Sequence, residues 1–319
     1  MNYKLIPASL LLLLCPAVSG YLYEIKVLRK WHPQYNRYHY FIGCCDFHDK
    51  AHVENEPQRK KIEELLTNAD IQDVHVNVED LSSSRGNGLI AGSFYINSTT
   101  GVLANLGNFC ANNNISYDNA EYRYCRVAAL GPIINNLQVN PVNFPSSSKI
   151  TIGMLKKEIE KTIKDLSYKI NPSNKPFMQE YIAQVKFIKT VMDKLQLGMY
   201  ESLGVAEYMN RVTTQLNRLD VIKHLLTFDG PLVGFNLVYS VEKNFNKQKN
   251  IAFAGGTHIN EAFDMLQKVA GWEKVSQSTV SIFKERDLKK CLGSNIVNGA
   301  YCVKPNPVSL ALLEHYLNN

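Results

Sequence analysis

Residues 252–261 constrain the fold of this chain more than any other segment. They read Ala-Phe-Ala-Gly-Gly-Thr-His-Ile-Asn-Glu: an apolar strand ends at Gly255 and Gly256, and His258 follows just before a helix expected over residues 260–269. Paired glycines allow a sharp turn and a close approach to a ligand, and an imidazole placed there can bind a metal ion or move a proton. The segment therefore predicts a strand-turn-helix unit with His258 at a candidate site.

Residues 38–49 repeat this plan near the other end of the chain. An aromatic and β-branched run is followed by Gly43, and then by Asp46 and His48. Since Asp46 and His48 are two residues apart, an extended backbone points both side chains to the same face. Such a pair can bind a divalent metal ion or serve as an acid/base pair, and the alternative is a charged surface loop that caps the next helix.

A third segment delivers a carboxylate. Residues 73–79 alternate valines with polar residues, which predicts a strand, and Glu79 stands at its end. In open α/β sheets the carboxyl ends of the strands border the ligand crevice, so we expect Glu79 beside Asp46 and His48. The alternative role of Glu79 is to cap the polar loop that follows.

Charges of both signs crowd the segment that begins with a predicted strand at residue 115. Asp118, Glu121, Arg123 and Arg126 suit an ion-pair network, with an anion-holding site as the alternative. We expect the network for most of them, with one arginine facing the crevice. Five other histidines are expected to be structural: His32, His39, His75, His224 and His315.

The periodicity of apolar residues divides the chain into parts. Residues 21–150 alternate strand-like and helix-like pieces, residues 151–228 show helical spacing almost throughout, and α/β character returns over residues 229–319. We predict an α/β fold whose central mixed sheet is built from two half-domains, the second completing the sheet of the first. The helical region between them is either a roof over the site or a packing element.

The first twenty residues have the order of a secretory signal peptide. Lys4 precedes an apolar core too short to span a bilayer, and small residues follow it up to Ser19 and Gly20. We therefore expect cleavage near residue 20 and a secreted or periplasmic protein with no transmembrane segment afterwards. The net charge of +6 is scattered along the chain, which does not support nucleic-acid binding.

The cysteines fit an exported protein. Six remain after the predicted cleavage, an even number, and disulfides persist outside the cytosol. Cys291 and Cys302 flank a short loop and are the pair expected to join. For Cys44 and Cys45 we favour the role of small buried residues on a core strand over metal binding.

Several enzyme classes lack their motifs in this sequence. There is no Gly-x-Ser-x-Gly turn, no phosphate-binding glycine loop followed by Lys-Ser/Thr, and no His-Glu-x-x-His helix. These absences disfavour a serine hydrolase, a nucleoside triphosphatase and a zinc protease of that type.

The strand with Gly43 and Asp46, the strand ending at Glu79, the helical insertion and the late Gly255-Gly256-Thr257-His258 motif together resemble the erythromycin esterase/ChaN-like and TraB/TIKI-like superfamily. The resemblance implies a pseudo-symmetric sheet with a helical lid, in a group that contains metal-dependent hydrolases and haem-binding proteins. The early motif departs from the family, because Asp46 stands where a histidine is usual.

These features lead to one main hypothesis and one rival. The main hypothesis is an exported, metal-assisted hydrolase of peptide, ester or similar bonds, with Asp46, His48, Glu79 and His258 as catalytic residues. Asp46, His48 and His258 are the expected metal ligands, a divalent metal ion is the expected cofactor with haem as the alternative, and the substrate is a small molecule or peptide. The rival is a non-catalytic secreted binding or host-interaction protein on the same scaffold.

Overall fold

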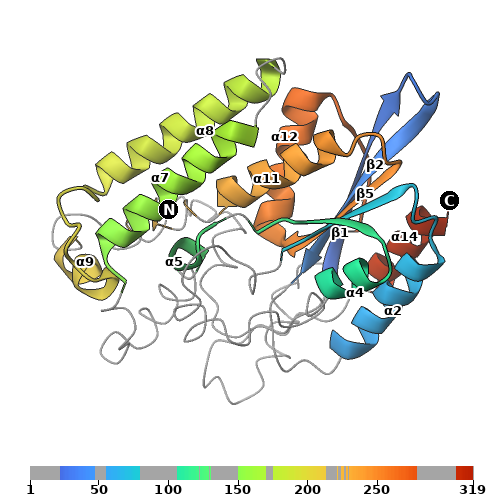
Figure 1. Ribbon diagram of the computed structural model, residues 1–319, viewed down its shortest axis with the longest axis horizontal. Helices are drawn as coiled ribbons and strands as arrows, with labels where there is room; N and C mark the ends of the chain where they lie inside the picture. The colour runs from blue at the N-terminus through green and yellow to red at the C-terminus, as the bar shows by residue number, and fades with distance from the viewer. Residues whose placement is uncertain are drawn as a thin grey trace, which may run out of the picture.

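One six-stranded mixed sheet organises the protein (Figure 1). The computed structural model describes residues 22–46, 55–79, 106–121, 123–128, 130, 150–169, 175–212, 221, 224–225, 228, 230–278 and 307–318. The strand order is β4-β3-β5-β2-β1-β6. The strands are β1 (Leu22–His32), β2 (Arg37–Asp46), β3 (Val74–Val78), β4 (Ser116–Asn119), β5 (Lys249–Gly255) and β6 (Glu273–Ser278).

The four strands β2, β5, β3 and β4 run parallel, whereas β1 is antiparallel to β2 and to β6. Strand β5 comes from the C-terminal part of the chain and lies between two strands of the N-terminal part. In its register Asp46 pairs with Gly255, and Val78 pairs with Phe253. The carboxyl ends of β2, β3 and β5 therefore meet at one edge of the sheet, as parallel strands require.

Helices cover both faces of the sheet, so the protein has three layers there. Side chains alternate along β2: Phe41 and Cys45 belong to the core beneath α11 and α12, while Ile42 and Cys44 belong to the core beneath α2, α4 and α14. Figure 1 shows these two sets of helices on opposite sides of the sheet. They are α2 (Asn55–Asn68), α4 (Leu106–Asn112), α11 (Gly230–Lys243), α12 (Gly256–Ala270) and α14 (Pro307–Asn318).

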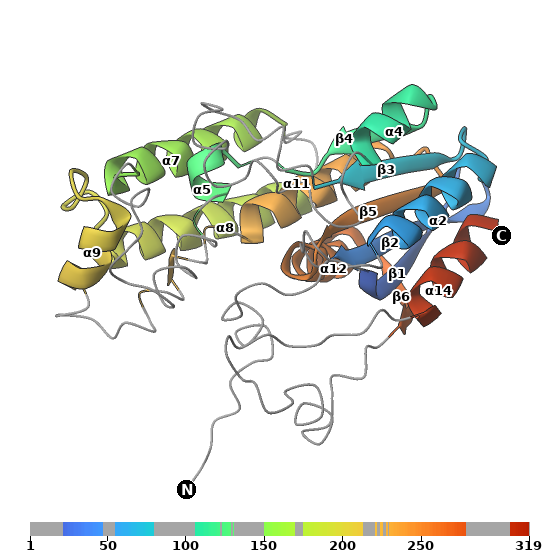
Figure 2. The same cartoon turned by 90° about the horizontal axis from the view of Figure 1, so that it is seen from below.

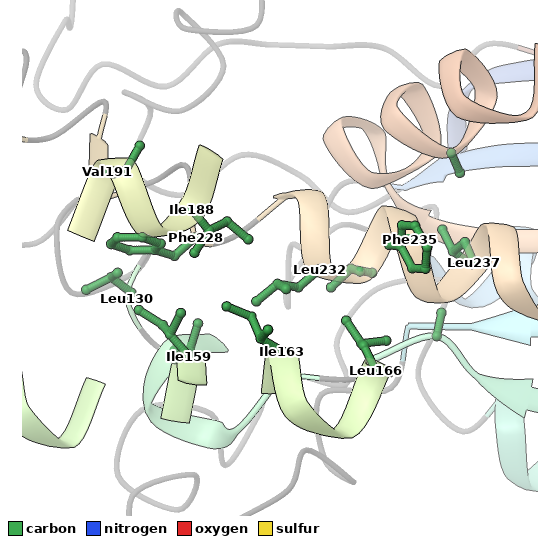
Figure 3. Close-up of a cluster of buried hydrophobic side chains, with 14 of the residues drawn as sticks. Leu130, Ile159, Ile163, Leu166, Ile188, Val191, Phe228, Leu232, Phe235 and Leu237 are labelled. Carbon is green, nitrogen blue, oxygen red and sulfur yellow. The ribbon is translucent and has the colours of Figure 1, made fainter. Parts of the chain in front are cut away.

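The region between the two sheet-forming parts is helical, as its periodicity predicts. It contains α7 (Ile152–Lys169), α8 (Lys175–Lys194) and α9 (Val205–Val212), which extend away from the sheet in Figure 2. Helix α7 contacts α11, and α8 contacts α12. Figure 3 shows Ile163 and Leu166 of α7 beside Leu232 of α11, within one buried apolar cluster. This cluster joins the insertion to the layer that covers the sheet.

Two elements differ from expectation, because β1 is a strand that the sequence did not predict and α12 starts earlier than predicted. Strand β1 carries several charged residues, so its sequence does not alternate cleanly, yet Ile25, Val27 and Leu28 are fully buried. Helix α12 begins at Gly256, four residues before the expected start, and ends at Gly271, whose φ of 68° lies in the left-handed region that glycine favours. His258 is therefore inside the first turn of this helix.

Cys44, Cys45 and Cys110 are buried, and no disulfide joins cysteines within the described ranges. The disulfide expectation is thus unsupported in this part of the protein, and the favoured role of Cys44 and Cys45 as small core residues agrees with their burial. The predicted Cys291–Cys302 pair and the signal peptide lie outside the described residues. Among the helices described, none is long and apolar enough to cross a membrane.

Candidate active site

Glu79 follows directly after β3 and is held there by β5. Its backbone N–H donates to the carbonyl of Phe253 at 2.9 Å, and its Oε2 accepts from the backbone N–H of Gly255 at 2.7 Å. Gly255 precedes the first residue of α12, so the carboxylate lies at the positive end of that helix. This position stabilises a negative charge, and it also supports a helical first turn at Gly256.

His258 lies against the same carboxylate. Its Nε2 is 3.3 Å from Oε1 of Glu79, and the two residues are only 5% and 3% exposed. A carboxylate only accepts hydrogen bonds, so Nε2 carries the hydrogen, and in the neutral imidazole Nδ1 then carries the lone pair. Nδ1 is buried and has no hydrogen-bond partner among the described residues. The imidazole is thus oriented on one side and unsatisfied on the other.

Arg123 completes a buried charge network with two carboxylates. Its Nε donates to Oε1 of Glu121 at 2.9 Å, its Nη2 donates to Oε2 of Glu121 at 2.5 Å, and the same Nη2 lies 3.3 Å from Oε1 of Glu79. Arg123 is 2% exposed. This paired geometry is the one in which a guanidinium binds carboxylates most strongly. The ion-pair interpretation of Glu121 and Arg123 therefore fits the structure.

Glu261 is a further residue of the site that the sequence motifs did not predict. It stands three residues after His258, which places both on the same side of α12. Burial raises the pKa of Glu261 to about 7, although the nearby His258 and Arg123 act in the opposite direction. Its Oε2 is enclosed and has no hydrogen-bond partner among the described residues. The three-residue spacing from His258 was the available sequence signal.

The structure brings together two of the four predicted catalytic residues. Asp46 is the last residue of β2 and pairs with Gly255, so its backbone lies at the same sheet edge as Glu79 and His258. The side chain of Asp46 and the whole of His48 fall outside what the structure describes. Glu79 and His258 come from distant parts of the sequence and lie 3.3 Å apart. This proximity is what the ends of parallel strands at one edge of the sheet predict.

The described side chains of this site do not by themselves suit a divalent metal ion. Both oxygens of Glu79 already accept hydrogen bonds, and Arg123 places a positive charge 3.3 Å from one of them. Within the described ranges, no group of three or more histidine, cysteine, aspartate or glutamate residues is arranged to hold a metal ion. Metal binding by Asp46, His48 and His258 stays a prediction.

A second buried histidine lies near the amino end of β3. His75 is 2.8 Å from Ser116 Oγ through Nδ1 and 3.2 Å from Ser240 Oγ through Nε2. Ser240 in turn donates to Asp118 at 2.9 Å, and the pKa of Asp118 is well below its usual range because His75 and Ser240 hydrogen-bond to its carboxylate. Both ring nitrogens of His75 are satisfied, which agrees with the structural role expected for it.

Comparison with known proteins adds no relative to this description. No family model matches the chain, and neither a curated protein nor a solved structure does so significantly.

Proposed function

We propose that this protein is a hydrolase in which His258 acts as a general base and Glu79 orients it. The observation that carries the proposal is the asymmetry of the imidazole: Nε2 is 3.3 Å from a carboxylate, while the buried Nδ1 has no described partner. A base held in one orientation with its lone pair available can take a proton from an attacking water molecule. An unpartnered nitrogen alone does not mark a catalytic histidine, because the buried His39 also has one. His258 differs from His39 in that its other nitrogen faces a carboxylate, at the carboxyl end of the parallel strands.

Glu261 supplies the complementary proton donor in this proposal. With a pKa of about 7, a large share of its carboxyl groups carry a proton at neutral pH. His258 would accept the proton of the water as the water attacks an ester or peptide carbonyl, and Glu261 would give its proton to the leaving group. Arg123, which is itself bound by Glu121, donates a hydrogen bond to Glu79 and so helps to fix its position.

The resemblance to the erythromycin esterase/ChaN-like and TraB/TIKI-like superfamily supports the same proposal. The late glycine-histidine motif and Glu79 meet at the edge of a sheet that combines strands from both ends of the chain. Export belongs to the proposal as well. Strand β1 begins at Leu22, so cleavage near residue 20 would leave every strand of the sheet in place.

The test compares His258→Ala with His315→Ala, a matched change at an exposed histidine of α14. Wild-type protein would be assayed against a panel of chromogenic esters and fluorogenic peptides. We expect His258→Ala to lose roughly 100-fold or more of the activity, as removal of a general base does, while His315→Ala keeps it. Equal activity in the two variants would remove His258 from the mechanism.

Metal content, measured on the same purified proteins, tests the predicted ligands. If Asp46, His48 and His258 bind a divalent ion, His258→Ala loses the metal while Glu79→Gln keeps it, because the oxygens of Glu79 are engaged elsewhere. Haem binding would appear as a Soret band in wild-type protein supplied with haemin.

One observation favours the rival function, a binding protein without catalysis. Glu79, Arg123 and His258 are each at least 95% buried, as expected of a static network that holds the sheet edge together. A wild-type protein that hydrolyses none of the panel, but binds one of its members with an affinity reduced by His258→Ala, would support this rival.

A further inference from the structure

We infer that helix α7 of the insertion holds Arg123 in the site, with Glu158 as the main positioning residue. Arg123 belongs to a short segment that leaves β4 and continues into α5 (Cys125–Ala128). This segment contributes the guanidinium that contacts both Glu79 and Glu121. Arg123 lies beyond the last residue of β4, and contacts from other elements help to fix its segment.

Glu158 binds the start of α5 from the side of α7. Its Oε2 accepts from the backbone N–H groups of Arg126 at 2.9 Å and Val127 at 3.1 Å, and its Oε1 lies 2.6 Å from Nη1 of Arg126. N–H groups in the first turn of a helix have no partner within the helix. A single carboxylate therefore satisfies two of them and pairs with a side chain of the same turn.

Two further residues of α7 contact the same segment. Asp165 accepts a hydrogen bond from the hydroxyl of Tyr124 at 2.7 Å, and Nζ of Lys161 lies 4.7 Å from the centre of the Tyr124 ring. Glu158, Lys161 and Asp165 are spaced by three and four residues, so they form one stripe along α7. This stripe contacts the residue directly after Arg123 as well as α5.

The chain just before Arg123 is also fixed with the help of α7. Asn236 of α11 donates to the carbonyl of Ala120 at 3.0 Å, and Lys169 at the end of α7 donates to Oδ1 of Asn236 at 3.1 Å. Arg123 is thus held between two anchored points. A displacement of α7 would move the guanidinium away from Glu79, and the insertion would in this way control the electrostatics of the site. The bearing of this control on chemistry rests on the proposed function.

The test follows the Nε–H of Arg123 by NMR, in protein labelled with ¹⁵N-arginine and ¹⁵N-tryptophan. This N–H donates to Glu121 inside the network, so its exchange with solvent reports on local opening. The indole N–H of Trp272, which donates to Glu242, serves as an internal reference away from the segment. In Glu158→Gln we expect exchange at Arg123 to rise roughly 10-fold while exchange at Trp272 is unchanged.

The matched control is Glu160→Gln, because Glu160 is on the same helix with its side chain 54% exposed. It should leave both exchange rates as in wild type. Unchanged exchange at Arg123 in Glu158→Gln would overturn the inference, and so would an equal acceleration at Arg123 and Trp272, which would indicate general loss of stability. If Glu158→Gln does not fold, Asp165→Asn, which removes the charge of the carboxylate that accepts from Tyr124, is judged by the same two signals. The exchange experiment needs no substrate, so its failure is distinct from a failure of His258→Ala to lose activity.

Discussion

Oε1 of Glu79 lies 3.3 Å from Nε2 of His258 and also 3.3 Å from Nη2 of Arg123, so one oxygen atom is shared between an imidazole and a guanidinium. The second oxygen accepts from the N–H of Gly255. One carboxylate therefore links the end of β3, the segment after β4 and the start of α12. Each of the predictions below follows from this arrangement or from its surroundings.

Replacing Glu79 with glutamine should destabilise the protein by about 2 kcal/mol, the scale of hydrogen bonds to a charged group. The amide can still accept from Gly255, and Arg123 keeps its paired bonds to Glu121, so the loss comes from the weaker contacts of the neutral amide with Arg123 and His258. Denaturant unfolding monitored by circular dichroism measures the change. The matched surface variant Glu160→Gln should stay within about 0.5 kcal/mol of wild type. A loss below about 1 kcal/mol in Glu79→Gln would mean that the pair contributes little.

Glu261 should make the stability of the protein depend on pH. Its pKa rises from 4.5 to about 7 on folding, so the folded state binds the proton more tightly than the unfolded state. This contribution is fully present below about pH 4.5 and is lost as the pH rises to about 7, amounting to about 3 kcal/mol. Glu261→Gln, which cannot ionise, should be less dependent on pH across this interval.

The measurement for Glu261 is chemical unfolding at about pH 5 and about pH 8, for wild type, Glu261→Gln and the control Glu160→Gln. The stability difference between the two pH values should shrink in Glu261→Gln alone. If wild type and Glu261→Gln show the same difference, the carboxyl is ionised in the folded protein and is no proton donor at neutral pH.

Replacing Gly43 with alanine should push α12 away from the sheet. A Cβ on Gly43 would lie 2.5 Å from Cγ2 of Ile259, which is the residue next to His258. The branched side chain of Ile259 has little freedom to move, so we expect a loss of about 1–3 kcal/mol. Gly198→Ala is the matched control, since its Cβ would come no closer than 3.9 Å to another residue. Equal stability of the two variants would show that α12 can shift without cost.

Cys110 should resist alkylation while the protein is folded. Its side chain is fully buried, and burial raises the pKa of its thiol to about 12, so almost none of it is the reactive thiolate. Brief labelling with iodoacetamide at about pH 8, followed by peptide mapping, should modify Cys110 only after denaturant is added. Ready modification in the native protein would show that α4 opens locally.

The sequence was sufficient to predict the strands that carry the residues of the site. The apolar run before Gly255 predicts β5, the alternating valines predict β3, and the rule that parallel strands end at one edge brings Glu79 to His258. The helical periodicity of the insertion is equally clear, because its buried residues recur at helical spacing along α7.

The remaining features depend on contacts between distant residues, which local patterns do not contain. The early start of α12 is accompanied by the carboxylate of Glu79 at its first turn, supplied by another strand. The contact between Arg123 and Glu79 depends on the pairing of β3 with β4, and the pKa of Glu261 rises only when α12 packs against its neighbours. Strand β1 was not predicted because charged residues interrupt its apolar pattern. Packing accommodates these charges, as it does for Lys26, whose ammonium group lies over the ring of Phe263.

The central position of β5 has a consequence for how the protein is made. Strands β2 and β3 do not pair with each other and are joined only through β5, which the ribosome produces after the whole helical insertion. Until then, the two strands have unsatisfied edges and cannot complete the sheet. Assembly must wait for pairings between residues far apart in the chain, which are slow to form and leave apolar strands open to aggregation. A nascent chain interrupted before residue 249 would therefore be a strong client for chaperones.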